Sequence, residues 1–269
     1  MRAVPDIFNQ ADQDFENRRL LLQQAEALER AAAADRVQYM DGVGVNATPI
    51  LDVGCGNGYS VMEWRTMGLA IGVDSSLYRL SRWVAEHKSS RPFVVADARA
   101  LPFRGSQFAY TVSSGMLEHV GVSEAASPYR VTALPTQRSS RAQVVSELSR
   151  VTRPGGTVIL DFPNGLFPID FWHGDSLGAF RVHRVPDVLN PTLWEIRSYV
   201  RDGKITLLPL RNRLRFRQIS RKWWGRLLSG PVQLFLRGLD VLPRSLVQPL
   251  LGLCYPFLVV RVRRDAIPP

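Results

Sequence analysis

The sequence predicts an α/β protein with a doubly wound, mostly parallel sheet. Three observations predict this class. From residue 50 onward, short apolar runs alternate with stretches of helical character. The first run, Ile50–Val53, leads into a glycine-rich turn, and aspartates close the second and third runs. Strands separated by helices are typical of βαβ units, which are joined by right-handed crossovers.

The central part of the chain supplies the predicted strands and the helices between them. Short apolar runs bounded by turn residues indicate strands, and longer periodic stretches indicate helices. The strands are Ile50–Val53, Ala70–Val73, Phe93–Ala96, Phe108–Ser113 and Thr157–Phe162. The helices are Tyr59–Thr66, Ser76–His87 and Ser140–Val151. We interpret Pro154-Gly155-Gly156 as the turn into the fifth strand.

The flanking parts of the chain have their own patterns. Periodicity predicts helices over residues 6–40 and over Pro191–Val200. Alternating arginines in Arg211–Ile219 predict a strand with one basic face, and Phe257–Arg263 is the predicted last strand. Leu227–Tyr255 is apolar but interrupted by prolines and charges. It is too broken for a membrane span, so we expect one or two short helices that cap the core, with an element that dips into a membrane surface as the alternative.

Composition narrows the class of protein. The chain has 269 residues, of which 45% are hydrophobic, so it can bury a sizeable core. Its first residues lack an apolar signal region, and Cys55 and Cys254 make neither a disulfide framework nor a zinc set. We therefore expect a cytoplasmic protein in a reducing compartment.

The charge of this basic protein is unevenly distributed. The formal net charge is +10. Between Arg197 and Arg226 ten lysines and arginines face one acid, Asp202. Such a concentration predicts an anionic partner, which is a membrane surface, a phosphorylated substrate or a nucleic acid. A solvated basic face beside an apolar cap is the competing interpretation.

The glycine turn itself indicates how a nucleotide would be held. A dinucleotide fingerprint requires G-x-G-x-x-G, but Tyr59 stands where the third glycine belongs, and the pattern is Gly54-x-Gly56-x-Gly58. Asp74 ends the second strand, 22 residues after Asp52, near the ~20-residue offset of an acid that binds ribose hydroxyls. Asp97 ends the third strand, where an acid can accept a hydrogen bond from an exocyclic amine. A helix N-cap is the alternative for each aspartate alone.

Five segments of the sequence resemble the successive motifs of class I S-adenosylmethionine-dependent methyltransferases. They are "ILDVGCGNGYS", "AIGVDSS", "VVADARALPF", "AYTVSSGMLEHV" and "ELSRVTRPGGTVIL", within residues 45–165. The resemblance implies a seven-stranded sheet with a reversed last strand. It also implies S-adenosyl-L-methionine as cofactor. The implied cofactor-binding residues are Asp52, Gly54, Cys55, Gly56, Asn57, Gly58, Asp74, Ser75, Asp97, Ala98, Ser114 and Met116.

The resemblance also divides the chain. Residues 1–44 form an N-terminal helical segment, and residues 45–165 form the cofactor-binding core. Residues 166–269 supply the substrate-side loop, the basic strand, the apolar cap and the last strand of the same domain. The long stretch Gly121–Ser140 departs from relatives with a short link, and we expect it to cover the substrate.

Two histidines follow the best predicted strands and are the candidate catalytic residues. His119 belongs to the "EH" pair that the resemblance places at the cofactor's methionine end, and His173 sits among aromatic residues. For each, a structural hydrogen bond is the alternative. Glu118 can act as a helix-start anchor, and Asp161 and Asp170 are further candidates. Without an H-E-x-x-H or C-x-x-C set, no metal is predicted.

The remaining question is the acceptor of the methyl group. "SSGM" after the fourth strand is not the tetrad of base amine methylation, and no cysteine stands where a cytosine C5 nucleophile belongs. We expect a small-molecule, sugar or lipid-linked acceptor, methylated at oxygen, with peripheral contact to an anionic membrane. An RNA methyltransferase that uses the basic face is the alternative, and a non-enzymatic cofactor-binding regulator is a third. The sequence leaves the oligomeric state open.

Overall fold

The computed structural model describes most of the chain from Thr48 onward. The described residues are 27, 29–30, 33–34, 48–86, 92–126, 129–173, 180–208, 223–241, 250, 252–253 and 255–266. Two compact units divide the chain: residues 1–114, 143–158 and 263–269 form one, and residues 115–142 and 159–262 form the other. The domain boundaries at 45 and 166 remain predictions.

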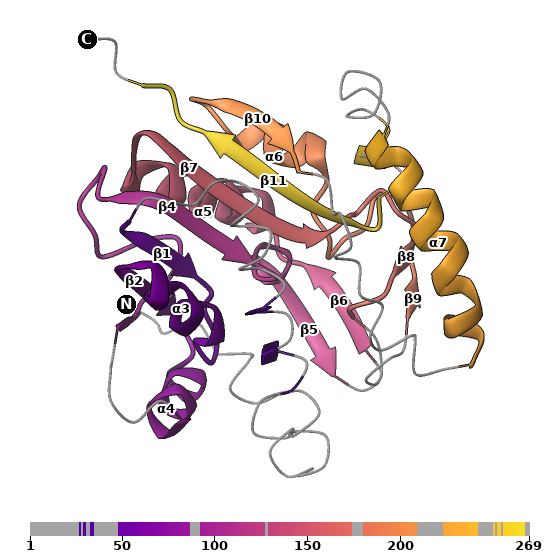
Figure 1. Cartoon of the computed structure of the whole chain (residues 1–269), viewed down its shortest axis with the longest axis horizontal. Coiled ribbons are helices and arrows are strands. Elements are labelled where there is room, and N and C mark those ends of the chain that lie inside the picture. The colour runs from indigo at the N-terminus through magenta and orange to yellow at the C-terminus, as the bar shows by residue number, and fades with distance from the viewer. Residues whose placement is uncertain are drawn as a thin grey trace. The chain divides into compact units, whose positions relative to one another are not determined.

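A seven-stranded sheet organises the fold (Figure 1). Its strand order is β10-β11-β7-β4-β1-β2-β3. The strands are β1 (Ile50–Val53), β2 (Ala70–Asp74), β3 (Phe93–Val95), β4 (Phe108–Ser114), β7 (Thr152–Pro163), β10 (Lys204–Leu207) and β11 (Phe257–Arg263). The predicted α/β class with seven strands is confirmed. The strands of the sheet centre read as near-continuous apolar runs because parallel strands are covered on both faces.

Strand pairing follows the predicted directions. β1 pairs in parallel with β2 and with β4, and β2 pairs in parallel with β3. The last strand runs the other way. Asn164 donates to the carbonyl of Pro256, whereas the Arg264 N–H donates to Gly156, so residue numbers rise along β7 as they fall along β11. Parallel strands end at the same edge of a sheet, which brings the ends of β1 and β2 together.

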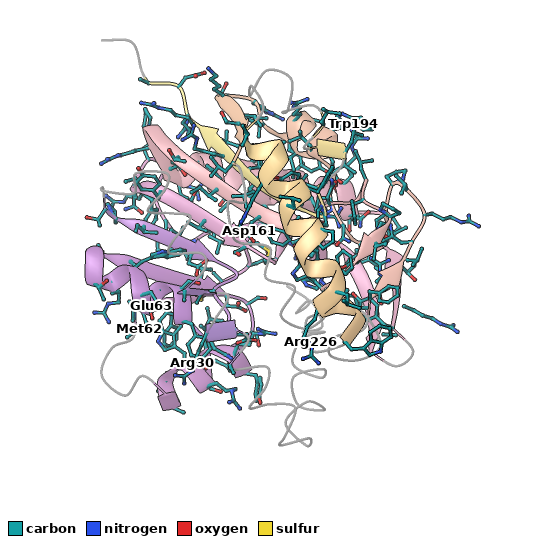
Figure 2. The ribbon with its side chains drawn as sticks, turned by 45° about the vertical axis from the view of Figure 1, so that its right-hand side comes forward. Arg30, Met62, Glu63, Asp161, Trp194 and Arg226 are labelled. Atoms are coloured by element: carbon teal, nitrogen blue, oxygen red, sulfur yellow. The ribbon has the colours of Figure 1, made fainter. Side chains whose placement is uncertain are left out.

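Two of the helices begin after a hydroxyl-bearing residue that accepts a hydrogen bond from a free N–H group of the first turn. The Ser76 hydroxyl accepts from the Arg79 N–H at the start of α4, and the Thr192 hydroxyl accepts from the Glu195 N–H at the start of α6. The predicted helix over Pro191–Val200 is thus present, with Trp194 exposed on it (Figure 2). The helices are α3 (Tyr59–Trp64), η1 (Arg65–Met67), α4 (Leu77–Glu86), η2 (Leu117–His119), α5 (Gln137–Val151), α6 (Leu193–Tyr199) and α7 (Trp223–Val241).

Two small antiparallel sheets lie within the second unit (Figure 1). β5 (Val122–Ala126) pairs with β6 (Tyr129–Ala133), and β8 (Ile169–Asp170) pairs with β9 (Arg181–Val182). The stretch that the sequence left without structure, Gly121–Ser140, is therefore a hairpin followed by the start of α5.

Two local predictions were wrong. Pro154-Gly155-Gly156 is not a turn before the fifth strand but part of β7, because Gly155 and Gly156 pair with Asp265 and Arg264 beyond β11. The apolar region after Leu227 does not start with a short helix. α7 is 19 residues long and runs through Pro231.

Some predicted elements lie outside the described residues. The basic strand over residues 211–219 is one of them, and so is most of the predicted N-terminal helix, of which Ala27, Glu29, Arg30, Ala33 and Ala34 are described and helical. Among the helices that the structure describes, none has the length and apolar character to cross a membrane.

Gly58 is predicted to be irreplaceable in the fold. Its φ is +77°, and a Cβ at this position would lie 2.3 Å from the Trp83 ring. Gly58→Ala should therefore lower the free energy of unfolding by at least about 2 kcal/mol in urea denaturation. Gly105→Ala is the control, because its nearest neighbour would lie at 3.4 Å, and it should change stability by less than about 0.5 kcal/mol. Equal stability of both variants would contradict this role.

Candidate functional site

The turn after β1 is built from backbone rather than from side chains. Gly54, Gly56 and Gly58 have φ values of +81°, +53° and +77°, a region that side-chain-bearing residues rarely adopt. The N–H groups of Gly54 and Cys55 both donate to the Val73 carbonyl, at 2.8 and 3.0 Å. The turn is therefore anchored to β2, and its glycines permit a bound ligand to approach the backbone closely.

Asp74 joins this turn to the helix that follows β2. One carboxylate oxygen accepts from the Gly56 N–H at 2.8 Å, and the other accepts from the Ser76 N–H at 2.8 Å. Each carboxylate oxygen has two lone-pair sites, so these two bonds leave capacity for the hydroxyls of a ribose. The predicted ribose acid therefore has a second function, since it fixes the glycine turn and the start of α4.

Residues that the sequence analysis missed also contact the turn. The Asn57 amide donates to Glu29 at 2.8 Å, and Glu29 lies 3.6 Å from the Arg79 guanidinium. The Arg30 guanidinium lies 4.9 Å from the centroid of the Tyr59 ring. The described residues of the N-terminal segment thus belong to the surroundings of the turn. No local pattern could reveal these contacts, because they join positions far apart in the chain.

Asp97 has a partner that the sequence analysis did not consider. Its carboxylate accepts from the backbone N–H and the guanidinium of Arg99, with the shortest contact at 2.6 Å. The hydrogen bond from Arg99 lowers the pKa of Asp97, so this half-exposed carboxylate is a charged acceptor at neutral pH. Its proposed contact with an adenine amine would share that carboxylate with Arg99.

The other predicted cofactor-binding residues lie in strands of the sheet or a few residues after them in the chain. Asp52 and Cys55 are buried, and burial raises the pKa of the Cys55 thiol well above its usual value. The thiol therefore packs as a small apolar group, as the sequence predicts. Three of the rest lie on segments that leave the strands: Ser75 is exposed after β2, Ala98 follows Asp97, and Ser114 ends β4. Met116 is the N-cap of η2.

The second unit contains both candidate catalytic histidines, and each is held by a carboxylate. His119 Nδ1 lies 2.6 Å from Glu124 Oε1, and the Tyr129 hydroxyl donates to Glu124 Oε2 at 2.7 Å. Burial opposes ionisation of Glu124, but the hydrogen bonds from His119 and Tyr129 lower its pKa to about 2. The hairpin that the sequence left unassigned thus supplies the partner of His119.

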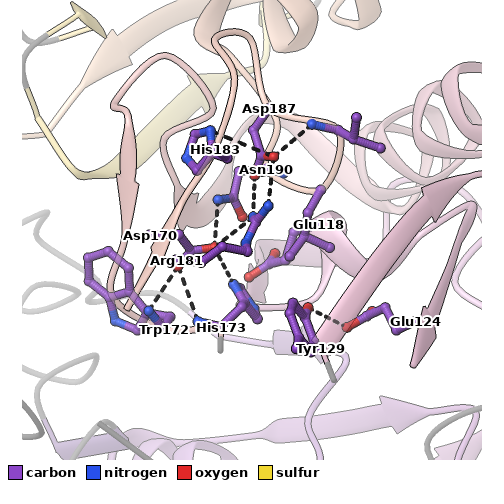
Figure 3. Close-up of polar contacts among 12 residues, drawn as sticks. Glu118, Glu124, Tyr129, Asp170, Trp172, His173, Arg181, His183, Asp187 and Asn190 are labelled. Carbon is purple, nitrogen blue, oxygen red and sulfur yellow. Dashed lines mark hydrogen bonds and ion pairs between the residues drawn. The ribbon is translucent and has the colours of Figure 1, made fainter. Parts of the chain in front are cut away.

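Asp170 is the centre of a hydrogen-bond network around His173 (Figure 3). This fully buried carboxylate accepts from His173 Nδ1 at 2.8 Å, from Arg181 at 3.1 Å and from Asn190 at 2.8 Å. Burial alone would lower the pKa of His173, but its hydrogen bond to Asp170 outweighs burial and raises it. The sequence assigned no specific role to Asp170, and the structure shows that this residue orients His173.

The two histidine rings lie together, and a third acid joins them. Their centroids are 5.1 Å apart at an interplanar angle of 76°, and the Tyr129 ring stacks on His173 at 6.2 Å. Glu118, His119 and His173 each offer a ligand atom within 4.8 Å of the other two. Figure 3 shows the Glu118 carboxylate beside the His173 ring.

Arg141 fixes the backbone of this cluster from within the second unit. Its guanidinium donates to the carbonyls of Glu118 and Leu189 and to the Glu195 carboxylate. The side chain is 2% exposed, which is rare for arginine, and its position in the first turns of α5 gives no sequence signal for burial.

Asp161, a further sequence candidate, and His183 have other contacts in the second unit. Asp161 is buried in β7 (Figure 2), and its carbonyl accepts from the Gly115 N–H at 3.0 Å. His183 lies near Asp187 at 3.7 Å, and its Nδ1 lies 2.9 Å from the Arg184 carbonyl. Neither contributes to the group formed by Glu118 and the two catalytic candidates.

Comparison with known proteins finds similarity to methyltransferases in the core of the chain. Residues 51–160 match the model of a family described as a methyltransferase domain. An uncharacterized methyltransferase of Mycolicibacterium gilvum is 30% identical over 147 residues, covering 51% of this chain and 51% of that protein. An uncharacterized protein of Methanocaldococcus jannaschii is 35% identical over 77 residues, covering 28% of this chain and 29% of that protein. The chain spans about half or less of the length of these curated relatives.

Solved structures show weaker likeness. The [4+2]-cyclase SpnF is 16% identical with a TM-score of 0.48, covering 87% of this chain and 82% of that one. An S-adenosylmethionine-dependent methyltransferase from Mesorhizobium loti is 16% identical with a TM-score of 0.44, covering 82% and 92%. Scores of this size do not establish a function, and the fold assignment rests on the strand order.

The sheet and the turn define a class I, Rossmann-like nucleotide-binding fold. Residues 51–160 match a methyltransferase domain, in agreement with the resemblance of the sequence motifs to class I S-adenosylmethionine-dependent methyltransferases. The residues of the turn fit that cofactor, because three glycines with positive φ leave the backbone open and Asp74 offers a carboxylate at the end of β2.

Asp74→Ala is expected to weaken binding of S-adenosylhomocysteine by about 10- to 100-fold, because a hydrogen bond to a charged group contributes about 1.5–3 kcal/mol. Isothermal titration calorimetry measures the affinity, and thermal unfolding without ligand separates this loss from damage to the turn. Asp202→Ala is the control, and it should bind like the unchanged protein. Undiminished affinity of Asp74→Ala would remove Asp74 from the ribose site.

Proposed function

We propose that this protein transfers a methyl group from S-adenosylmethionine to an oxygen atom of a small-molecule, sugar or lipid-linked acceptor. The observation that carries the proposal is the pair of carboxylate-held histidines, His119 and His173, that follow β4 and β7 in the chain. An amine acceptor can react without a strong base, whereas a hydroxyl must lose its proton. A pair of histidines oriented by carboxylates can accept that proton, and it therefore favours an oxygen atom as the acceptor.

In the proposed reaction, one set of residues holds the cofactor and another acts on the acceptor. When bound, S-adenosylmethionine supplies a methyl group on a positively charged sulfur. The turn from Gly54 to Gly58 and the carboxylate of Asp74 would hold and orient the cofactor. Because positioning supplies much of the rate of an in-line displacement, rigid attachment of the turn to β2 supports this role.

The histidine pair would handle the acceptor's proton. Each Nδ1 faces a carboxylate, which in a neutral ring is the nitrogen that carries hydrogen, so each Nε2 carries the lone pair. The side chains of His119 and His173 are 16% and 12% exposed, so a small ligand can reach them. A partner carboxylate also stabilises an imidazolium that forms during proton transfer.

A lipid-linked acceptor is favoured by one face of α7. Four apolar side chains on this helix are 67–85% exposed: Trp223, Leu227, Leu234 and Val241. At ~100° per residue they lie within about 40° of one another around the helix axis. Arg226 and Arg237 are also exposed near this stripe (Arg226 is labelled in Figure 2), which suits the surface of an anionic membrane.

Replacement of either histidine should abolish transfer without loss of the cofactor. His119→Asn and His173→Asn are expected to lower the methylation rate at least about 100-fold and to leave affinity for S-adenosylhomocysteine within about twofold. The assay uses S-adenosylmethionine with a labelled methyl group and three acceptor pools from cells of the source organism: polar small molecules, lipids and RNA. Label in the RNA pool alone would overturn the proposal in favour of RNA methylation.

The face of α7 has its own test in sedimentation with vesicles of anionic phospholipid. Binding is expected at low salt and should weaken at about 0.5 M salt because screening removes the arginine contribution. Leu227→Gln combined with Leu234→Gln should reduce binding at least about tenfold, since each leucine loses ~1.5 kcal/mol or more of apolar burial. Leu69→Gln, 56% exposed in the other unit, is the control. Unchanged binding of the double variant would exclude α7 as the contact.

A further inference from the structure

We infer that Glu118, His119 and His173 form a binding site for a divalent first-row transition metal ion such as Zn²⁺. Their ligand atoms lie within 4.8 Å of one another. Two imidazoles and one carboxylate are a ligand set that zinc and iron(II) use in proteins. Ligand atoms around a tetrahedral zinc ion lie about 3.3 Å apart, so a bound ion would draw the three atoms closer together.

Each of the two histidines has a carboxylate partner on one ring nitrogen, as metal-binding histidines usually do. A histidine that binds a metal through one nitrogen almost always donates its other N–H to a carboxylate, a carbonyl or water. Here Glu124 lies 2.6 Å from Nδ1 of His119, and Asp170 lies 2.8 Å from Nδ1 of His173. These partners fix the ring orientations and the tautomer in which Nε2 is the donor atom.

Glu118 supplies the observation that a histidine pair alone would lack. The residue is 2% exposed, and its Oε2 atom is buried without a hydrogen-bond partner among the described residues. A buried carboxylate without a full set of partners is costly, because its charge has lost its hydration. A cation bound by the Glu118 carboxylate and the two histidines would offset the charge of that carboxylate.

The net negative charge of the surrounding hydrogen-bond network also favours a bound cation. Among the described residues it contains five carboxylates and two guanidiniums, an excess of three negative charges when the histidines are neutral. The carboxylates are those of Glu118, Glu124, Asp170, Asp187 and Glu195, and the guanidiniums are those of Arg141 and Arg181. A divalent cation would offset most of this excess.

Three protein ligands leave part of the coordination sphere open. Structural zinc sites are closed by four protein ligands, whereas catalytic sites keep a position for water or substrate. The partial exposure of His119 and His173 gives such a ligand access. If the proposed function holds, on which this step rests, the open position would take the acceptor's hydroxyl oxygen, and in the metal-bound protein the ion, instead of the histidine lone pairs, would promote loss of its proton to solvent.

The sequence search missed this site because it covered only ligand sets carried on one short segment. Glu118 and His119 are consecutive in η2, but His173 lies beyond β8. Only the fold brings the third ligand to the first two.

The test is metal binding by the full chain after removal of metal with a chelator. Calorimetry with Zn²⁺ should show about one equivalent bound, and Co²⁺ should give the visible absorption of a protein-coordinated ion. Mg²⁺, which prefers oxygen ligands, should bind far more weakly. Glu118→Gln, His119→Asn and His173→Asn should each weaken Zn²⁺ binding at least about 100-fold, and Glu124→Gln about 10- to 100-fold.

His183→Asn is the matched control, because it removes a histidine that lies outside the set, and its Zn²⁺ affinity should be unchanged. Circular dichroism checks that each variant is folded, and the unchanged protein should melt at a higher temperature with Zn²⁺. Zn²⁺ binding no tighter than in a variant that carries all three substitutions would overturn the proposal. S-adenosylhomocysteine binding, measured on the same metal-free samples, should persist, so failure of the metal site and failure of the proposed function are distinguishable.

Discussion

The carboxylate of Asp74 holds together the part of the structure that we propose binds the cofactor. It accepts hydrogen bonds from Gly56 and Ser76, so one charged group attaches both the glycine turn and the start of α4 to the end of β2. The Val73 carbonyl adds a second attachment through Gly54. The turn therefore cannot shift unless the edge of the sheet shifts with it, and its open backbone stays in position for a ligand.

The second unit repeats this use of buried carboxylates on different groups. Asp170 is fully buried, yet its donors keep it ionised, because hydrogen bonds to the charged form outweigh the cost of burial and lower its pKa. Glu124, the partner of His119, is also kept ionised, because its hydrogen bonds outweigh the cost of burial and lower its pKa. In both units a charged oxygen orients a functional group through short hydrogen bonds. The difference is that Asp74 orients backbone, whereas Asp170 and Glu124 orient imidazole rings.

The local sequence predicted secondary structure correctly wherever the residues of a segment decide its conformation by themselves. The strands from Ile50 to Ser114 were predicted nearly to the residue, since buried parallel strands are apolar runs bounded by turn residues. Prediction from the local sequence failed where contacts with residues far along the chain determine the conformation. Gly155 and Gly156 extend β7 because residues beyond β11 pair with them. α7 passes Pro231 intact, a position at which propensity predicts a break.

The sequence by itself determined the class of this protein, because the spacing of Gly54 and Gly56 and the acid at position 74 are short-range features that stand directly after predicted strands. The tertiary structure decided the composition of the histidine cluster. More than fifty residues separate His119 from His173, and their partners come from a hairpin and from the short strand β8, neither of which carries a recognisable motif. Contacts at that separation depend on how the chain closes upon itself, which no local periodicity records.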